Sequence, residues 1–384
     1  MTKKIAVIIP KYGLSGGAER FSFELTERIA KNRRYDVHVF ANKWVDGGGA
    51  VTFHKVPIIF FPKWLTTVSF AYFVNKQIAP LHFDIIHTHE RIFSADLCTV
   101  HSLPHHYWVK KIRRKKLLSL FDLGTIYVEK KLAVSKKCRL FMPVSRTAQD
   151  IIVEEFPQLG NKTQVMHPGV DTTKFAPCNT PAQKKARKGE FGFAEEDTVL
   201  LFIGMNFELK GLDNIMTALK LMNQDASKKL KLLVVGKGDV AKYSQRAKDI
   251  GIDKDVVFTG PRTDMENIYC CGDLLILLSE FDTFGMVVLE AMASSLPVII
   301  SETVGAKDLV NNGANGFVVP RDDIKTICSN ISAALNPLVY EKMAGNAFLT
   351  AQDHSWDNKA ETIMTVYEQL SAKIAQGKPA EGLI

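Results

Sequence analysis

The sequence predicts an α/β protein with two doubly wound, Rossmann-like domains that face each other across a cleft. Short apolar runs of strand length alternate with helical patterns, which is typical of parallel sheets joined by crossover helices. The length of 384 residues is too great for one ordinary core. Between residues 172 and 188, prolines and a basic run indicate a linker. We therefore expect an N-terminal domain over residues 1–172 and a C-terminal domain over residues 173–357, with a last helix over 358–384 that packs back on the first domain.

The strands of both domains are predicted from short apolar runs. In the first domain they are Ile5–Ile9, Val37–Phe40, Asp84–His87, Asp96–Val100, Arg139–Pro143 and Gln164–His167, and a helical zone is expected from about residue 105 to 135. In the second domain they are Val199–Ile203, Lys231–Val235, Val256–Thr259, Leu274–Leu278 and Val298–Ile300.

A glycine loop follows the first strand and precedes a helical pattern. It contains Gly13, Leu14, Ser15, Gly16 and Gly17. Such a loop lets the backbone approach a phosphate or a sugar closely, although glycine in a turn between a strand and a helix also has purely steric uses. The G-x-G-x-x-G spacing is absent and no acidic residue ends the second strand, which disfavours a dinucleotide-dependent hydride transfer.

The stretch Ser279–Pro297 carries the main candidate site. It leaves a buried strand, starts a helix near Gly285, and places Glu290 as the lone charge on an apolar helix that Pro297 ends. Free amides at Gly285 and Met286, with the partial positive charge of the helix start, suit a diphosphate. A carboxylate on an apolar face needs a hydrogen-bonding partner, and a ribose diol is one. Alternatively, Asp282 or Thr283 is a plain N-cap and Glu290 extends to solvent.

Lys210 is a candidate phosphate ligand because it follows a strand in the glycine-bounded loop Gly204–Gly211. A lysine at the carboxyl end of a strand can neutralise phosphate, but it can also be an ordinary solvated lysine. His101 similarly follows a strand, at the edge where open α/β sheets bind ligands, and a structural role is the alternative.

Metal binding is not predicted. Seven of the ten histidines lie between His82 and His167. However, we expect His87 and His89, two residues apart, to point to opposite faces, which gives no ligand geometry. The six cysteines form neither CxxC pairs nor a compact framework, which indicates free thiols in a reducing cytosol. No apolar run is long enough to span a membrane.

The net charge of +8 is concentrated in one segment. Between His101 and Leu140, eleven Lys or Arg residues stand against Asp122 and Glu129. This composition attracts polyanions: nucleic acid, anionic lipid head groups or phosphorylated glycolipid. The aromatic and basic residues at its start suit a segment that lies on an anionic membrane, or else a solvated basic helix. The candidate membrane or acceptor residues are Trp108, Lys110, Lys111, Arg113, Arg114, Lys115 and Lys116.

Taken jointly, these motifs resemble the retaining GT-B glycosyltransferases of glycosyltransferase family four over nearly the whole chain. The matching segments are Gly16–Arg20, Pro143–Ser145, His167–Asp171 with Phe175, Gly204–Gly211, Gly236–Asp239, and Asp282–Ala293 followed by Pro297–Ile299. The resemblance implies that Asp282 holds the transferred sugar and Glu290 the nucleotide ribose. It also implies that amides near Met286 and Val287 meet the diphosphate, that Lys210 neutralises it, that the loop at Gly16 and Gly17 closes over it, and that His101 lies near the sugar. Gly204, Phe284 and Gly285 belong to the same nucleotide-sugar site.

Two departures from the family pattern concern the donor site. The first acid is usually Glu, whereas this chain has the shorter Asp282, with Glu280 as a possible substitute. The basic pair before the glycine is usually Arg-Lys, and here it is Leu209-Lys210, so Arg262 is the nearest candidate for the second phosphate contact. Within the family, Lys11-Tyr12, Gly16-Gly17, Arg20 and the zone at Tyr107-Trp108 are similar to lipopolysaccharide core glucosyltransferases.

The resulting functional hypothesis is a metal-independent, retaining transfer from a nucleotide diphosphate-sugar, with a UDP-sugar favoured. The acceptor would be a hydroxyl on an anionic glycolipid or a lipopolysaccharide core. We expect a cytoplasmic protein, peripheral on the cytoplasmic membrane, that uses no cofactor and binds no nucleic acid. Two alternatives stay open. A GT-B hydrolase or epimerase would act on the nucleotide sugar itself, and a non-catalytic nucleic-acid-binding protein would use the basic segment. The latter lacks interleaved aromatics and a base-reading motif.

Overall fold

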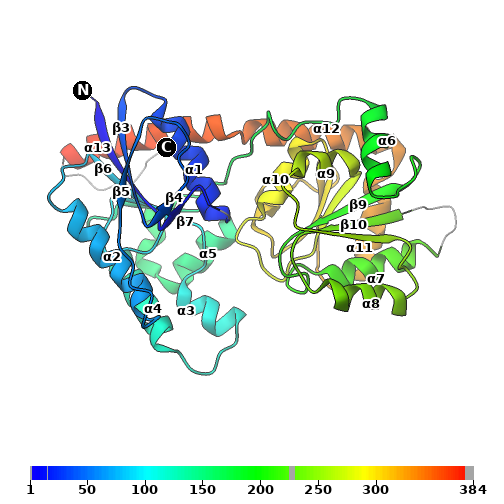
Figure 1. The fold of residues 1–384 in the computed structure, drawn as a ribbon, viewed down its shortest axis with the longest axis horizontal. Coiled ribbons are helices and arrows are strands. Elements are labelled where there is room, and N and C mark those ends of the chain that lie inside the picture. Colours follow the sequence, from blue (N-terminus) through cyan, green and yellow to red (C-terminus); the bar gives the residue numbers. More distant parts are fainter. Residues whose placement is uncertain (1, 15, 225–229, 377–384) are drawn as a thin grey trace. The chain divides into compact units, whose positions relative to one another are not determined.

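The structure is a computed structural model, and it describes residues 2–14, 16–224 and 230–376. It divides into two compact units, each with its own parallel sheet (Figure 1). The first comprises residues 1–169 and 356–384, and the second comprises residues 170–355. The prediction of an α/β protein with two Rossmann-like domains is confirmed. Ser15 of the predicted glycine loop and residues 377–384 of the predicted last helix lie outside the described residues.

The sheet of the first unit has the strand order β5-β3-β1-β6-β7-β8, and its neighbouring strands pair in parallel. Its strands are β1 (Lys3–Ile8), β3 (Tyr35–Ala41), β5 (Val51–Lys55), β6 (Ile85–Thr88), β7 (Leu97–Val100) and β8 (Leu140–Pro143). A separate short pair joins β2 (Lys11–Tyr12) to β4 (Lys43–Trp44). Parallel strands covered on both faces read as nearly continuous apolar runs, which is why most of them could be predicted.

Helices cover both faces of this sheet. One face packs on α2 (Leu65–Ile78), α4 (Leu120–Ala133) and α5 (Arg146–Glu155), whose buried side chains join those of the strands in one core. On the other face lie α1 (Gly17–Ala30) and α13 (Trp356–Ala375). α13 packs along α1 and is held by Arg28 to Asp357 at 2.8 Å and by Lys3 to Glu368. The last helix of the chain therefore belongs to the first unit.

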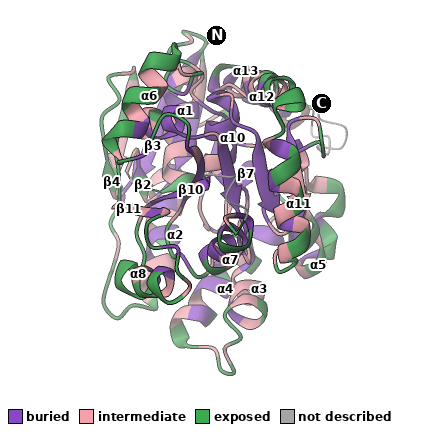
Figure 2. Cartoon of the chain, turned by 90° about the vertical axis from the view of Figure 1, so that its right-hand side faces the viewer, coloured by how far each residue is buried: buried purple, intermediate pink, exposed green. Residues whose placement is uncertain are grey.

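The predicted helical zone from 105 to 135 is interrupted. It contains α3 (His105–Tyr107), a π-helical turn η1 (Trp108–Ile112), a loop, and then α4. The loop is largely exposed and appears in green and pink between α3 and α4 in Figure 2. α4 restarts at a capping box, in which Ser119 and Asp122 each satisfy a backbone amide of the other. The signal for this break was the Ser-x-x-Asp spacing.

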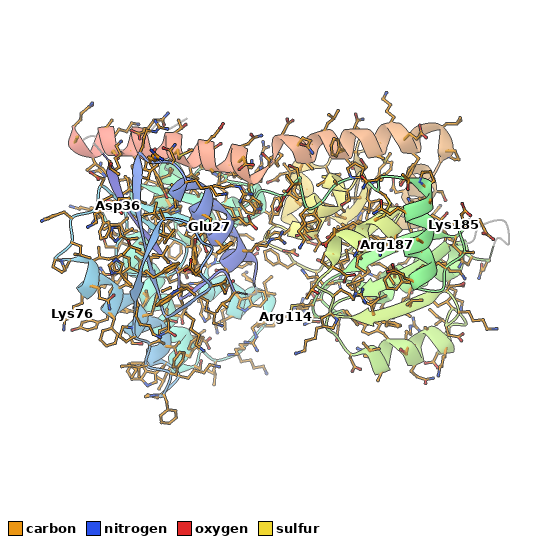
Figure 3. The ribbon with its side chains drawn as sticks, turned by 45° about the horizontal axis from the view of Figure 1, so that its top comes forward. Glu27, Asp36, Lys76, Arg114, Lys185 and Arg187 are labelled. Atoms are coloured by element: carbon orange, nitrogen blue, oxygen red, sulfur yellow. A yellow bond between two sulfur atoms is a disulfide. The ribbon has the colours of Figure 1, made fainter. Side chains whose placement is uncertain are left out.

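The glycine run 47–49 packs against the buried carboxylate of Glu27. Glu27, on α1 (labelled in Figure 3), is buried and accepts a hydrogen bond from the Tyr12 hydroxyl at 2.7 Å. A Cβ atom on Gly47 would lie 2.3 Å from the Glu27 carboxylate, and one on Gly49 would lie 2.5 Å from it. These glycines therefore allow the chain to pass directly over Glu27.

The sheet of the second unit has the order β11-β10-β9-β12-β13-β14, again with parallel pairing. Its strands are β9 (Thr198–Ile203), β10 (Leu230–Val235), β11 (Val256–Gly260), β12 (Leu274–Leu277), β13 (Val298–Ser301) and β14 (Gly316–Val319). Its helices are α6 (Pro181–Glu190), α7 (Leu212–Met222), α8 (Val240–Asp249), α9 (Met265–Cys271), α10 (Met286–Ala293), α11 (Ile324–Ala334) and α12 (Pro337–Asp353). The short helical segments η2 (Pro157–Lys162), in the first unit, and η3 (Gly305–Leu309), in the second, complete the elements.

Two element predictions were wrong. Residues 164–167 are not assigned to a strand, although Gln164 and Met166 donate backbone hydrogen bonds to β8 at 3.0 and 2.9 Å. The predicted linker is helical in its second half, because Thr180 caps α6 and Pro181 occupies its first turn. α6 then packs against α9.

The prediction of six free thiols was also wrong. Cys178 and Cys270 form a disulfide, whereas Cys98, Cys138, Cys271 and Cys328 are free. The segment after residue 170 runs along α9, and the ring centroids of Phe175 and Tyr269 lie 5.5 Å apart. Cys178 therefore reaches Cys270, the residue after Tyr269. A pair separated by 92 residues leaves no spacing signal. Cysteine usage therefore gives no argument for a reducing compartment.

Candidate functional site

The start of α10 lies at the carboxyl end of β12 in the second unit. Gly285 precedes the helix with a φ of 88°, a left-handed conformation that suits glycine. Met286 and Val287 form the first turn, and both are partly exposed. Phe284, just before the helix, is buried. The helix start predicted from the sequence is therefore formed and reachable by an anion.

Asp282 and Lys210 meet in front of this helix. The Lys210 ammonium forms an ion pair with an Asp282 carboxylate oxygen, and each side chain is about one-fifth exposed (20% and 19%). The other Asp282 oxygen accepts from the Phe284 amide at 3.2 Å. The Asp282 amide donates to Thr303 at 3.2 Å, and its carbonyl accepts from Gly305 at 3.0 Å. Two residues that were 72 positions apart in the sequence thus share one contact.

Close backbone packing fixes the loop that carries Lys210. Gly211 has a φ of 76°, and a Cβ atom there would lie 2.1 Å from the Leu278 carbonyl oxygen. Gly204 passes against Gly236, where an added Cβ atom would lie 1.9 Å from the Gly204 oxygen. The Glu280 amide also donates to the Leu209 carbonyl at 2.7 Å. Glycine is therefore required at Gly211, the end of the loop, and at Gly236, which lies against its start.

Arg321, which follows β14, braces the same loops and was not predicted. It donates to the Leu278 carbonyl at 3.1 Å and to the Glu208 carbonyl at 3.3 Å. It also lies 3.7 Å from a carboxylate oxygen of Glu280. Glu280 is thus turned toward Arg321, whereas Asp282 is the acid that lies beside Lys210.

Arg262, the predicted second phosphate ligand, lies beyond β11 at the edge of the sheet. Its guanidinium forms two hydrogen bonds with Asp264, at 2.8 and 2.6 Å. Arg321, by contrast, contacts the loops that carry Lys210 and Asp282. Arg321 could not be predicted as a site residue, because it follows β14, a strand that was not predicted.

Glu290 is buried, with 6% of its surface exposed, and its partner in the structure is Tyr269. The Tyr269 hydroxyl donates to a Glu290 carboxylate oxygen at 2.8 Å. A carboxylate accepts several hydrogen bonds, so a ribose diol and the phenol can share it. Tyr269 in turn packs edge-on against Phe175. Phe175 therefore helps to hold the partner of Glu290 in place.

In the first unit, Gly16 and Gly17 are exposed at the start of α1, and Gly16 has a φ of 144°. A Cβ atom on Gly16 would lie 2.1 Å from the Glu19 carboxylate. His101 is partly buried, and its ring packs at a steep angle against the Phe21 ring, with ring centroids 4.8 Å apart. Its Nε2 lies 3.0 Å from Nδ1 of His89.

The expectation that His87 and His89 point to opposite faces was wrong. Their ring centroids lie 4.3 Å apart, because residues two apart in an extended segment lie on the same face of it. These neighbouring histidines nevertheless do not form a group that could hold a metal ion. Across residues 2–14, 16–224 and 230–376, no group of three or more His, Cys, Asp or Glu side chains could hold a metal ion.

The basic segment places its residues unevenly. Lys111, Arg113, Arg114 and Lys116 are exposed, whereas Trp108, Lys110 and Lys115 are partly buried. Arg114 (labelled in Figure 3) lies on the loop between η1 and α4. Asp122 is buried and fastens this loop, since it contacts Lys115 at 3.3 Å and His105 at 2.9 Å. None of the described helices is long and apolar enough to cross a bilayer.

Asp122 should make the stability of this region depend on pH. Burial raises its pKa, but hydrogen bonds from Ser119, His105 and Lys115 outweigh burial and hold the pKa below its ordinary value. A carboxyl with a lowered folded-state pKa stabilises the fold above its unfolded pKa of about 3.9, and that contribution disappears as the pH falls. Asp122→Asn should therefore lower the melting temperature by about 2–4 °C at pH 7.

This difference should shrink toward pH 3. Thermal melting of both proteins across this range measures it, with the exposed Asp253→Asn as the matched control. An equal difference at pH 7 and at pH 3 would contradict the role given to Asp122.

Comparison with known proteins identifies the class. Residues 15–174 match the family model described as Glycosyltransferase Family 4. Residues 197–337 match the model described as Glycosyl transferases group 1. The chain is a glycosyltransferase of the GT-B type.

Solved GT-B structures share this glycosyltransferase's fold. WaaG, a glycosyltransferase involved in lipopolysaccharide biosynthesis, is 20% identical and has a TM-score of 0.77, with 94% of this chain and 99% of WaaG covered. Anabaena Alr3699/HepE, crystallised with UDP and glucose, is 19% identical with a TM-score of 0.70, and the match covers 96% of this chain and 100% of that protein.

Among curated proteins, an uncharacterized glycosyltransferase of Methanocaldococcus jannaschii, MJ1607, is 24% identical over 390 residues. That match covers 95% of this glycosyltransferase and 98% of the relative. A D-inositol 3-phosphate glycosyltransferase of Corynebacterium kroppenstedtii is 26% identical over 245 residues, which cover 60% of this chain and 53% of that enzyme.

Proposed function

We propose that this enzyme transfers a sugar, with retention of configuration and without a metal, from a nucleotide diphosphate-sugar to a hydroxyl of an anionic glycolipid or lipopolysaccharide core. A UDP-sugar is the favoured donor. The observation that carries the proposal is the ion pair of Lys210 and Asp282 in front of α10, the helix that bears Glu290. HepE, with UDP and glucose, and WaaG, involved in lipopolysaccharide biosynthesis, support the choice of donor and acceptor class.

The residues suggest how the donor is held. The amides of Met286 and Val287 and the Lys210 ammonium would face the diphosphate, which gains negative charge as the sugar departs. A diphosphate at Lys210 competes with Asp282 for the ammonium. The Asp282 carboxylate is then available to accept hydrogen bonds from sugar hydroxyls. Binding of the leaving group and recognition of the sugar are therefore linked through one lysine.

The stereochemical outcome is tested by NMR of the product. Retention predicts that the new glycosidic bond has the same anomeric configuration as the sugar in the donor. An inverted product would overturn the proposal of retention. Incubation with donor alone separates the alternative, because a hydrolase or epimerase would release or isomerise the sugar at the full rate without acceptor. Full activity in the presence of a strong chelator is expected for a metal-independent transfer.

We also propose that the enzyme lies on an anionic membrane surface. This proposal rests on an exposed apolar surface next to the basic loop between η1 and α4. Two segments form it, 59–64 and 117–124. They are neighbours, since the Lys63 ammonium lies 5.5 Å from the Phe121 ring and a Cβ atom on Gly124 would lie 3.1 Å from the Trp64 carbonyl. Its most exposed apolar side chains are Phe60 at 62%, Phe61 at 88%, Leu117 at 85% and Leu120 at 67%.

Exposed aromatic and leucine side chains beside Lys and Arg are the combination that enters an anionic lipid surface. The apolar residues that would insert differ from the expected Trp108, because Trp108 is partly buried. α2 and α4, which flank this surface, lie side by side in Figure 1.

Phe61→Ser should reduce binding to phosphatidylglycerol-containing vesicles about 10-fold, because one exposed Phe contributes about 1.5–3 kcal/mol when buried in an apolar medium. Leu338→Ser is the matched control, since Leu338 is 92% exposed on the second unit. Vesicle flotation measures the bound fraction. Equal binding of the two variants, or equal binding to neutral phosphatidylcholine vesicles, would contradict the proposed surface.

A further inference from the structure

Three histidines of the first unit form a chain of contacts. Both ring nitrogens of His87 have partners, since Nδ1 lies 2.7 Å from the Tyr367 hydroxyl and Nε2 lies 2.8 Å from the Thr99 hydroxyl. The His89 ring lies tilted beside that of His87 and nearly parallel to that of His101. His101 is the residue for which the family resemblance implies a position near the sugar.

His89 differs from His87 in having one nitrogen without a partner. It is 5% exposed, and its Nδ1 lies 3.0 Å from His101 Nε2. Its Nε2 is buried, and the described part of the chain offers it no hydrogen-bond partner. The His89 ring lies beside the rings of Phe21 and His87. The His101 ring lies beside those of Phe21 and His89.

This arrangement determines where the protons lie. Burial lowers the pKa of His101 to about 3 and the pKa of His89 well below its ordinary value, so both rings are neutral at pH 7. A proton on His89 Nε2 would be a buried, unpaired N–H group, which is rarer and costlier than an unpaired acceptor. The proton of His89 therefore lies on Nδ1 and is donated to His101 Nε2. His101 must then carry its own proton on Nδ1.

We propose that His89 is a positioning residue that fixes His101 as the Nδ1–H tautomer, so that His101 acts as a hydrogen-bond donor toward an oxygen of the transferred sugar. The second half of this inference rests on the proposed function, and the first half does not. Free neutral imidazole favours the Nε2–H form, so the protein has to impose the other one. The contact that imposes it is the hydrogen bond from His89.

The tautomer is measured directly by long-range ¹H–¹⁵N NMR of the full chain labelled at histidine, with His101→Gln to assign the signals. We expect His101 as Nδ1–H in the wild type. His89→Asn should keep that tautomer, because the Asn amide places an N–H near the position of Nδ1. His89→Leu, of similar bulk but without a donor, should shift His101 toward Nε2–H. A wild-type His101 in the Nε2–H form would overturn the inference, whether or not the variants fold.

Kinetics test the link to transfer. His89→Leu should lose about 10-fold in kcat/KM, the effect of one hydrogen bond, while His89→Asn should keep most of the activity. An equal loss in both variants would contradict positioning through a donated hydrogen bond. If His101→Ala left transfer unchanged, the role of His101 toward the sugar would fail. The tautomer result would then stand separately from the proposed function.

Discussion

Replacing Lys210 by alanine should lower the rate of sugar transfer about 100-fold or more. Loss of one positioned group that stabilises developing charge typically has this effect. The change also leaves the Asp282 carboxylate without its ion-pair partner. The fall should appear mainly in kcat, because the charge on the leaving diphosphate increases as the sugar departs. Steady-state kinetics with a saturating nucleotide sugar measure it.

Two variants make this prediction specific. Lys210→Arg keeps the charge and should retain more activity than Lys210→Ala. Lys242→Ala removes a lysine of the same unit that is 56% exposed and pairs with Glu208, so it should have wild-type kinetics. A Lys210→Ala enzyme as active as Lys242→Ala would mean that Lys210 does not touch the diphosphate.

Glu290→Gln should weaken the binding of a nucleoside diphosphate about 10- to 100-fold. Hydrogen bonds to a charged group contribute about 1.5–3 kcal/mol, and the neutral amide loses that contribution from the ribose hydroxyls. The amide oxygen can still accept from Tyr269, so the buried contact at 2.8 Å is kept and the fold should be preserved. Isothermal titration with UDP measures the affinity.

Tyr269→Phe is the control for Glu290, because it removes the phenol and leaves the carboxylate. It should weaken UDP binding less than Glu290→Gln does. The comparison of UDP with UMP adds a second check, since both carry the ribose and the variant should weaken both by the same factor. A loss confined to UDP would assign Glu290 to the phosphates and refute its role at the ribose.

The sequence predicted those parts of the site that follow one another along the chain. The carboxylate Asp282, the start of α10 and the carboxylate Glu290 lie within nine residues, and local propensity places them. Glycine positions were informative because a left-handed φ, or a neighbouring atom about 2 Å from where a Cβ atom would lie, excludes other residues.

The contacts that hold these residues come from distant segments and could not be predicted. Tyr269, the partner of Glu290, lies on another helix, and Arg321 follows a strand whose short run Gly316–Val319 gave no clear signal. The strand β5 was missed for a similar reason, since Val51–Lys55 alternates apolar and polar residues at the edge of the sheet. Pairwise packing, rather than local sequence, fixes such partners.

The most direct test of the central claim is the thermal stability of the protein with a panel of nucleotide sugars. A ligand that binds the folded state raises the melting temperature according to its concentration over its dissociation constant. We predict that a UDP-sugar stabilises the wild type, and that Lys210→Ala and Glu290→Gln reduce this stabilisation while Lys242→Ala keeps it. A panel in which no nucleotide sugar raises the wild-type melting temperature would contradict a donor site at the start of α10.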